Sequence, residues 1–553
     1  MVKFNLMNDI KFRLGFLTKA QSTIISAAGI LAITSGATAL LGLIKSRLLT
    51  SFFGVSTDLS VFYTADRIPT LIYSLFVIGV LSTVFIPIYS DSLKNAEENA
   101  NKIASTIINF GMLFFVIFGG FAFIYARRII EVISVYQFTP TEVTLGTNLM
   151  RIILLAQFFL LLGSFLTSLA QTHNLFLLPS LAPVIYNLSM ILGIILLSEK
   201  LGIYGPTFGI LIGALIYLLV QTPIIKKIKF EYKFTIQTKD EYIKKIISII
   251  PPRFINVLIN TSMATIYNSL AIMISKPSVI HLKFADQLQS FPISLFGASI
   301  ASAALPTLSK NTKDPEKFKK IFVTSLHQML FFVLPCSVIL LVLRVPVIRI
   351  VYGASKFPWE STVKTSYVLA FFSISMFSQC ATLLVTRAFY ALKDTITPLK
   401  TTGIFAPLNL VFCLIFINFW GWGTWSLAFA YSVTSILEML LLLFLLGKRL
   451  DGFNIKELLY PFVKMSYASF FMGISLYIPL KLLDKFVFDT TKTMQLLAIT
   501  GIASLLGMLA YLIFTKLFKV EEIQLMHQLI KKAGFKKALW ESSKVTTVTE
   551  IEN

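Results

Sequence analysis

Long apolar runs are the feature of this chain that most restricts its fold. They recur along most of its 553 residues, and each is close to the ~20 residues that an α-helix needs to cross a bilayer. Because a membrane interior offers no water to backbone N–H and C=O groups, chains built from such runs form helices there. Composition agrees, since 56% of the residues are hydrophobic, 14% are charged and the mean hydropathy is +0.78. The sequence therefore predicts an all-α polytopic membrane protein.

The runs predict about fourteen transmembrane helices, as two sets of six and a final pair. The first set is expected near 23–44, 62–89, 103–125, 147–171, 179–198 and 203–223; the second near 246–274, 284–308, 321–343, 364–391, 397–418 and 423–446; the pair near 458–483 and 493–516. The expected divisions are an N-terminal segment (1–20), an N-lobe (21–223), a basic linker (224–245), a C-lobe (246–446), the C-terminal helix pair (447–516) and a tail (517–553).

A short pattern occurs twice in the chain, 220 residues apart. Ala65-Asp66, Ser74-Leu75-Phe76 and Ser82 correspond to Ala285-Asp286, Ser294-Leu295-Phe296 and Ser302. Such self-similarity indicates a duplication, and many transporters place a substrate site between two related halves. We therefore expect the two lobes to be pseudo-symmetric. The two repeated aspartates are expected either to cap helix N-termini in a shared fold or to contact a substrate.

The net charge of +22 follows membrane topology rather than a nucleic-acid surface. With a cytoplasmic N-terminus, roughly 30 Lys and Arg residues fall inside against roughly 16 outside, as the positive-inside rule expects. Aromatic and basic residues are not interleaved, so nucleic acid is not an expected partner. Both termini are expected in the cytoplasm, with the linker near anionic lipid headgroups. An amphipathic helix is expected over about 520–540, along the membrane surface.

The sequence carries no motif for catalysis or metal binding. Its cysteines (Cys336, Cys380 and Cys413) are isolated and its histidines (His173, His281, His327 and His527) are scattered, so metal-ligand and disulfide spacings are missing. Walker, GxSxG, HExxH and paired-carboxylate motifs are also missing. We therefore expect no enzyme activity and no cofactor, and any transport would be passive or driven by a gradient.

A set of motifs runs from the first expected helix to the eleventh. Its members are Gly42 to Gly54, Arg67-Ile68-Pro69, Phe85-Ile86-Pro87, Pro179-Ser180-Leu181-Ala182-Pro183 with Asn187, Phe284-Ala285-Asp286, Leu305-Pro306-Thr307-Leu308-Ser309, Tyr352-Gly353, and Phe389-Tyr390-Ala391-Leu392-Lys393-Asp394-Thr395 with Thr397-Pro398. Together they resemble the MurJ (MviN) lipid II flippase family. The resemblance implies a MOP-superfamily fold, with two six-helix lobes around a central cavity and two further helices forming a lipid-facing groove.

The resemblance also implies a substrate, lipid II, which is undecaprenyl-diphosphate carrying the peptidoglycan disaccharide-peptide. It would be moved from the inner to the outer leaflet of the bacterial cytoplasmic membrane, with membrane lipids and cell-wall synthesis proteins as partners. The polyprenyl tail can stay in the bilayer, whereas the headgroup would lose many hydrogen bonds in hydrocarbon. Only the headgroup needs a path, and a pair of lobes opening alternately to each side would shelter it.

Cations facing such a cavity would pair with the diphosphate. Laying the family motifs on this chain places Ala39, Tyr73, Ser74, Ile78 and Gln287 at positions that are usually charged in the family. The residues expected to contact the substrate are Lys45, Arg47, Arg67, Arg253, Lys283, Asp58, Asp66, Asp286 and Gln287. Arg253 is the most suggestive because a charge at mid-depth is costly; its alternative role is an arginine that reaches the membrane surface. The alternative role of Lys45, Arg47 and Arg67 is to anchor the protein to lipid headgroups at the outer surface.

Polar residues within apolar runs provide an ion-coupling hypothesis. Glu438, Asn260 and Asn409 are expected either to bind a monovalent cation or a proton, or to form hydrogen bonds between helices.

Two other functions stay open. The altered cavity charges leave room for a flippase of another polyprenyl-diphosphate saccharide, such as an O-antigen or exopolysaccharide unit. The basic tail leaves room for a non-transporting scaffold that recruits cell-wall factors.

Overall fold

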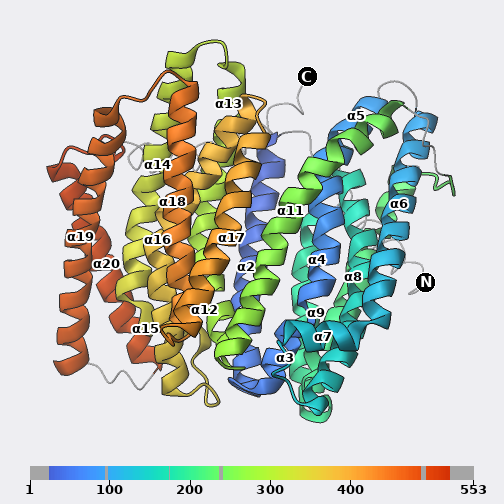
Figure 1. Cartoon of the computed structure of the whole chain (residues 1–553), viewed down its shortest axis with the longest axis horizontal. Coiled ribbons are helices and arrows are strands. Elements are labelled where there is room, and N and C mark those ends of the chain that lie inside the picture. Colours follow the sequence, from blue (N-terminus) through green and yellow to red (C-terminus); the bar gives the residue numbers. More distant parts are fainter. Residues whose placement is uncertain are drawn as a thin grey trace, which may run out of the picture. The chain divides into compact units, whose positions relative to one another are not determined.

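The computed structural model describes residues 24–93, 97–173, 175–228, 230–235, 241–486 and 493–523. All regular elements in these ranges are helices (Figure 1). Thirteen of the described helices are long and apolar enough to cross a membrane, and α2 (Ile24–Phe53) precedes them as a further long helix. The all-α multi-pass fold with about fourteen membrane helices is therefore confirmed. The expected N-terminal segment (1–20) and amphipathic tail helix, from residue 524 onward, lie outside the described residues.

The helices follow one another in an order that repeats. In the first half they are α3 (Thr57–Ala65), α4 (Arg67–Phe76), η1 (Val77–Phe85), α5 (Ile86–Leu93), α6 (Glu97–Ile124), α7 (Ala126–Ile133), α8 (Pro140–Thr172), α9 (Leu177–Leu201) and α10 (Tyr204–Lys227). In the second half they are α11 (Glu241–Ile274), α12 (Ser278–Pro292), η2 (Ile293–Ala298), α13 (Ser299–Lys310), α14 (Pro315–Val342), α15 (Arg344–Tyr352), α16 (Trp359–Ala391), α17 (Ile396–Asn418) and α18 (Trp425–Arg449). The final pair is α19 (Ile455–Phe486) and α20 (Thr493–Leu517).

The duplication extends well beyond the motif that revealed it. The helices α14, α16, α17 and α18 begin 218, 219, 219 and 221 residues after α6, α8, α9 and α10. Each half also contains a π-helical segment in the repeated region, η1 and η2. Tyr217 and Glu438 consequently occupy equivalent places, each 13 residues after the start of its helix. The two halves therefore share a backbone plan while carrying different side chains.

Neither repeated aspartate caps a helix with its side chain. Asp66 lies at the break between α3 and α4, but its side chain makes no capping bond; it accepts a hydrogen bond from Thr70 Oγ1 at 3.1 Å. Asp286 lies inside α12 and accepts one from Gln289 Nε2 at 3.2 Å. The capping prediction is therefore wrong for Asp286, which is far from a helix start. Asp66 does stand at the N-cap position of α4, but its side chain bonds to Thr70 and not to the helix backbone.

Both aspartates are instead linked to equivalent helices. Gln157 of α8 donates to the Thr70 hydroxyl at 3.5 Å, and Gln379 of α16 donates to Gln289 Oε1 at 3.0 Å. Each aspartate is thus linked through one polar side chain to a glutamine on the long helix of its half, which is α8 for Asp66 and α16 for Asp286. This parallel favours the shared-fold interpretation of the repeat.

The chain forms two compact units. Unit 1 comprises Met1–Phe284, Val351–Val368 and Ala406–Leu427, and unit 2 comprises Ala285–Ile350, Leu369–Phe405 and Ala428–Asn553. Their borders differ from those of the expected lobes, because α11 belongs to unit 1 and the helices α12, α15, α16, α17 and α18 are each divided. The lobe boundaries at 223 and 246 stay a prediction.

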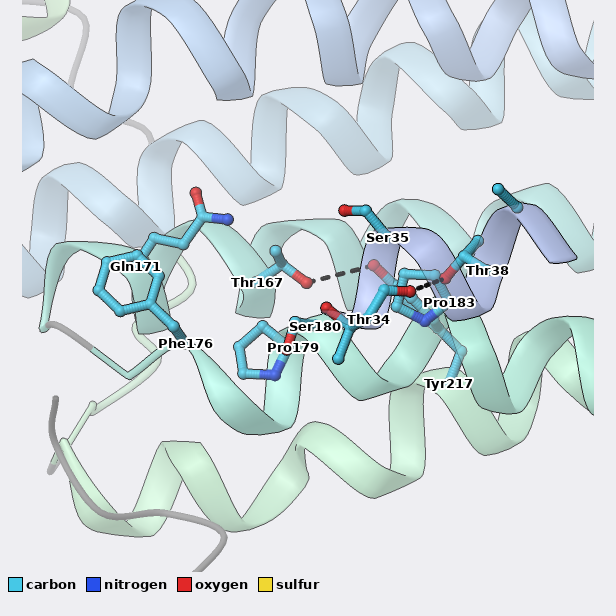
Figure 2. A pocket seen from close by; sticks show the side chains of 11 residues that line it. Thr34, Ser35, Thr38, Thr167, Gln171, Phe176, Pro179, Ser180, Pro183 and Tyr217 are labelled. Atoms are coloured by element: carbon cyan, nitrogen blue, oxygen red, sulfur yellow. Dashed lines mark hydrogen bonds between the residues drawn. The ribbon is translucent and has the colours of Figure 1, made fainter. Parts of the chain in front are cut away.

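In unit 1, glycines bring α9 and α10 into backbone contact. Gly205, Gly209 and Gly213 are four residues apart on α10, which places them on one face. A Cβ added to Gly193 of α9 would lie 2.6 Å from Gly209 Cα. Small residues that allow such close approach are a common basis of helix packing in membranes. The same two helices, together with α2 and α8, line a pocket of about 410 Å³ (Figure 2).

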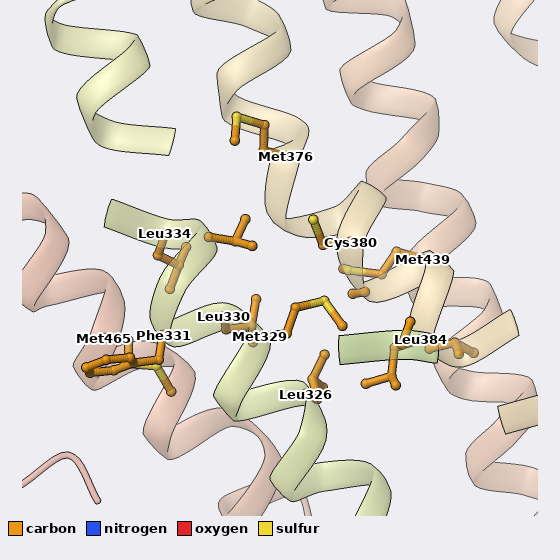
Figure 3. Packing of buried hydrophobic residues seen from close by; sticks show 14 of the residues in the cluster. Leu326, Met329, Leu330, Phe331, Leu334, Met376, Cys380, Leu384, Met439 and Met465 are labelled. Carbon is orange, nitrogen blue, oxygen red and sulfur yellow. The ribbon is translucent and has the colours of Figure 1, made fainter. Parts of the chain in front are cut away.

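Unit 2 has an apolar core formed by α14, α16, α18 and α19. Its side chains include Leu326, Met329, Leu330, Phe331, Leu334, Met376, Cys380, Leu384, Met439 and Met465 (Figure 3). Tyr511 of α20 is buried against this core and donates its hydroxyl to the Phe331 carbonyl at 2.8 Å. The C-terminal helix pair is thereby fixed to α14 in this unit.

Candidate functional site

Lys45 of α2 is a half-buried cation among membrane helices of unit 1. Its Nζ donates to Asn187 Oδ1 of α9 at 3.2 Å, and the buried Asn187 donates its Nδ2 to the Pro183 carbonyl at 2.9 Å. Lys45 also interacts electrostatically with Lys283 and Asp66. Because its hydrogen-bond partner is a neutral amide, that bond orients the ammonium group without neutralising its charge.

Arg67, at the start of α4, has the same kind of support. Its Nε donates to Asn268 Oδ1 of α11 at 3.3 Å. Asn268 is fully buried and donates its Nδ2 to Thr64 Oγ1 at 3.0 Å. Tyr63 interacts electrostatically with both Asp66 and Arg67, so the phenol, the carboxylate and the guanidinium share one region of unit 1.

We call Lys45, Asp66, Arg67 and Lys283 the cationic cluster. Two lysines and an arginine stand against one aspartate, so the cluster carries a net positive charge. Charged groups within membrane helices are costly, by about 2.5–3.5 kcal/mol at the bilayer centre on insertion scales, so the cluster is a candidate functional site. Cations held by amides provide both the charge and the N–H donors that an anionic oxygen requires. The cluster is therefore suited to binding phosphate groups.

The other residues expected at the substrate site are placed differently. Arg47 is half-buried on α2, two positions after Lys45 and so on another face of that helix. Asp58 is exposed in the first turn of α3. Asp286 and Gln287 belong to unit 2. Arg253 lies in α11, but its side chain lies outside the described residues. The structure thus unites four of the nine expected residues in one cluster.

The residues expected to couple transport to an ion are distributed over both units. Glu438, in unit 2, is half-buried and accepts a hydrogen bond from Thr402 Oγ1 at 2.9 Å. Asn409, in unit 1, is buried and accepts one from Tyr267 OH at 2.5 Å. Asn260 is exposed and donates to the carbonyl one turn earlier at 2.9 Å. Within the described part of the chain, three or more His, Cys, Asp or Glu residues never gather as a metal site would require.

Comparison with protein families decides the identity. The family model described as lipid II flippase MurJ matches residues 49–498. The chain belongs to the MurJ lipid II flippase family. Among relatives of this MurJ-family chain, the probable lipid II flippase MurJ of Buchnera aphidicola subsp. Acyrthosiphon pisum is 28% identical over 413 residues, covering 73% of this chain and 80% of the relative. The lipid II flippase MurJ of Thermosipho africanus is 28% identical over 480 residues, covering 87% and 93%.

Solved structures give the same assignment for the MurJ-family chain. A lipid II flippase MurJ in an inward closed conformation matches with a TM-score of 0.75 and 28% identity, covering 89% of this chain and 99% of that one. A MATE-family multidrug resistance transporter of the MOP superfamily matches with a TM-score of 0.63 and 13% identity, covering 75% and 94%; this likeness concerns the fold. The family and the MOP fold inferred from the motifs are confirmed, and the family is one of transporters.

Three of the neutral residues that the motif comparison placed at the expected cavity have defined surroundings. The Tyr73 hydroxyl shares a hydrogen bond of 2.7 Å with Ser164 Oγ. Ala39 lines the pocket of unit 1, and Ile78 is 52% exposed.

Proposed function

We propose that this MurJ-family protein is a lipid II flippase, which moves the undecaprenyl-diphosphate disaccharide-peptide from the inner to the outer leaflet by alternating access. The observation that carries the proposal is the cationic cluster, held among membrane helices of a chain whose family match spans 49–498. The apolar polyprenyl tail is soluble in the hydrocarbon of the bilayer, whereas the diphosphate and its sugars need polar partners throughout the crossing.

The cluster residues have separate roles in this proposal. Lys45, Arg67 and Lys283 pair with the diphosphate oxygens, and Arg67 presents the geometry best matched to phosphate. Asn187 and Asn268 keep the first two cations oriented before the substrate arrives. Asp66 offsets part of the positive charge, so that binding is not too strong for release. No covalent bond changes during the crossing, and we infer that the protein is a transporter without enzyme activity.

We place the protein in the bacterial cytoplasmic membrane with both termini in the cytoplasm, which is the orientation that its basic residues favour.

Ion coupling is proposed for Glu438, with Asn260 and Asn409 as further candidates. A carboxyl group within a membrane helix supports this role because it can exchange a proton or hold a monovalent cation. Cell-wall synthesis proteins are the proposed protein partners.

The test is replacement of the lipid II flippase in bacteria depleted of their own. Growth and the outer-leaflet fraction of lipid II, measured with a membrane-impermeant amine reagent, are compared for wild type, Lys45→Ala and Lys448→Ala. Lys448 is an exposed lysine in the last turn of α18 and serves as the matched control. We expect wild type and Lys448→Ala to restore both readouts and Lys45→Ala to lose at least ~10-fold of the outer-leaflet signal. If wild type restores neither but moves another polyprenyl-diphosphate saccharide, that alternative function is correct.

A further inference from the structure

The pocket of unit 1 has a composition unlike that of the cationic cluster. It lies between α2, α8, α9 and α10, and its volume of about 410 Å³ falls in the range of small-molecule sites. Its lining consists of Thr34, Ser35, Thr38, Ala39, Thr167, Gln171, Phe176, Pro179, Ser180, Pro183 and Tyr217 (Figure 2). Seven of these residues carry a hydroxyl or amide group, and none carries a charge. The pocket therefore has an uncharged and mostly apolar surface in which a few hydrogen-bonding groups are set, and it fits a neutral ligand that has both kinds of surface.

The hydroxyl groups of the pocket are arranged to accept hydrogen bonds. Thr38 donates its hydrogen to the Thr34 carbonyl at 2.7 Å, and Ser180 donates to the Leu177 carbonyl at 2.9 Å. A hydroxyl has one hydrogen and two lone pairs, so both oxygens retain acceptor capacity. A ligand rich in O–H or N–H donors satisfies such oxygens, whereas a phosphate anion, which only accepts, does not.

Tyr217 extends this pattern. The Thr167 hydroxyl donates to Gln221 Oε1 at 2.8 Å, so the contact of 3.2 Å between Thr167 and Tyr217 uses the hydrogen of Tyr217. The phenolic oxygen is then a further acceptor. Gly163 allows the ring to take this position, because a Cβ there would lie 2.3 Å from Tyr217 Cδ1.

Apolar faces complete the pocket. Phe176, Pro179 and Pro183 present flat hydrocarbon surfaces along α9 and its start. Alternation of acceptor oxygens with such surfaces matches a pyranose ring, which has hydroxyl groups at its edge and C–H groups on its faces. The volume and lining thus favour a saccharide.

Two helices connect this pocket to the cationic cluster. On α2, Lys45 follows Thr38 by seven residues, which is two turns and about 10.5 Å along the axis. On α9, the Pro183 carbonyl accepts from Asn187, which in turn accepts from Lys45 Nζ. A diphosphate at Lys45 is therefore within about two helical turns of the pocket, a separation suited to a sugar attached to that diphosphate.

We propose that this pocket binds the saccharide of the lipid-linked headgroup while the cationic cluster binds its diphosphate. The inference rests on the proposed function and adds a second contact region to it. Ala39, at a position usually charged in the family, keeps the lining neutral and leaves space for the sugar. Recognition of the headgroup is then divided between a charged and an uncharged subsite within unit 1.

The experiment measures dissociation constants of the detergent-purified full chain for two probes, lipid II and undecaprenyl diphosphate without sugars. The variants are Ala39→Phe, which fills the pocket, Thr38→Val, which removes one acceptor with little change of volume, and Leu40→Phe as the matched control. Leu40 is adjacent on α2 but 63% exposed. Melting temperatures of all variants are compared, so that the Thr38 variant carries the test if Ala39→Phe does not fold.

We expect Ala39→Phe to weaken lipid II binding by at least ~10-fold and Thr38→Val by ~5-fold, the effect of losing one hydrogen bond. Both variants should leave the affinity for undecaprenyl diphosphate unchanged, and Leu40→Phe should change neither affinity. Equal weakening of both probes, or no weakening of lipid II, would overturn the saccharide pocket while leaving the flippase proposal intact. If wild type binds neither probe, the proposed function fails and the inference fails with it.

Discussion

The contact between α9 and α10 predicts that a single methyl group on Gly193 destabilises the protein. A Cβ at this position would lie 2.6 Å from Gly209 Cα, 2.8 Å from the Gly205 carbonyl oxygen and 3.0 Å from the Gly209 nitrogen. Non-bonded carbon atoms prefer about 3.5–4.0 Å, so the helices must separate by about 1 Å. All three neighbours are backbone atoms, which cannot rotate away as a side chain would.

The expected cost can be estimated from two opposing effects. Overpacking costs about 1–3 kcal/mol, whereas alanine is favoured over glycine in a helix by about 0.5–1 kcal/mol. Gly193→Ala should therefore lower the free energy of unfolding by about 1 kcal/mol at the middle of these ranges, and by about 2.5 kcal/mol at most. Because α9 carries Pro183 and Asn187, the same displacement should also weaken lipid II binding.

Gly501 of α20 provides the matched control, because a Cβ there meets no atom within 4 Å. Thermal unfolding of the detergent-purified chain should give a lower midpoint for Gly193→Ala than for wild type, and an equal or higher midpoint for Gly501→Ala. Equal midpoints for the two alanine variants would refute the reasoning, since they would show that α9 and α10 do not depend on this close approach.

Three further predictions concern charged groups. Lys45→Met, which keeps the length of the side chain without its charge, should weaken binding of undecaprenyl diphosphate at least ~10-fold in a titration; unchanged affinity would remove Lys45 from the site. Partial burial acts to raise the pKa of Asp394, but hydrogen bonds from Thr397 and the charge of Arg449 outweigh it and hold the pKa below its usual value. The resulting stability should be present above about pH 4 and be lost as the pH falls through the lowered pKa, and Asp394→Asn should abolish this dependence in thermal unfolding; an unaltered pH profile would contradict it. Glu438→Gln should remove the response of transport to a proton or sodium gradient in proteoliposomes, and a preserved response would exclude Glu438 from coupling.

The membrane helices were predictable because each must bury about 20 apolar residues, a signal that needs no tertiary information. Short amphipathic helices do not give this hydropathy signal. The helix α7 has eight residues with Ala126, Ile130 and Ile133 buried and Arg127 and Arg128 exposed, an amphipathic pattern too short for a hydropathy window. The π-helical segments depend on local packing, and no residue pattern in the sequence predicted them.

The candidate site was predictable only in its charges. Lys45 and Arg67 were identified by laying the family motifs on the chain, and Asp66 was identified from the internal repeat. Their amide partners were harder to identify, since Asn268 lies 201 residues from Arg67 in sequence and contacts of that kind follow from the fold. Thr34 and the other hydroxyl residues of the pocket are ordinary in membrane helices, where such side chains usually bond to their own backbone.

The correspondence between Tyr217 and Glu438 shows what an ancient doubling of the chain makes possible. In the first copy this position holds Tyr217, which lines the pocket that we assign to the saccharide. In the second copy it holds Glu438, the acid that we propose for ion coupling. Substitutions at one of these two positions can therefore alter the pocket or the ion-coupling candidate separately, because each position belongs to its own copy of the duplicated helix.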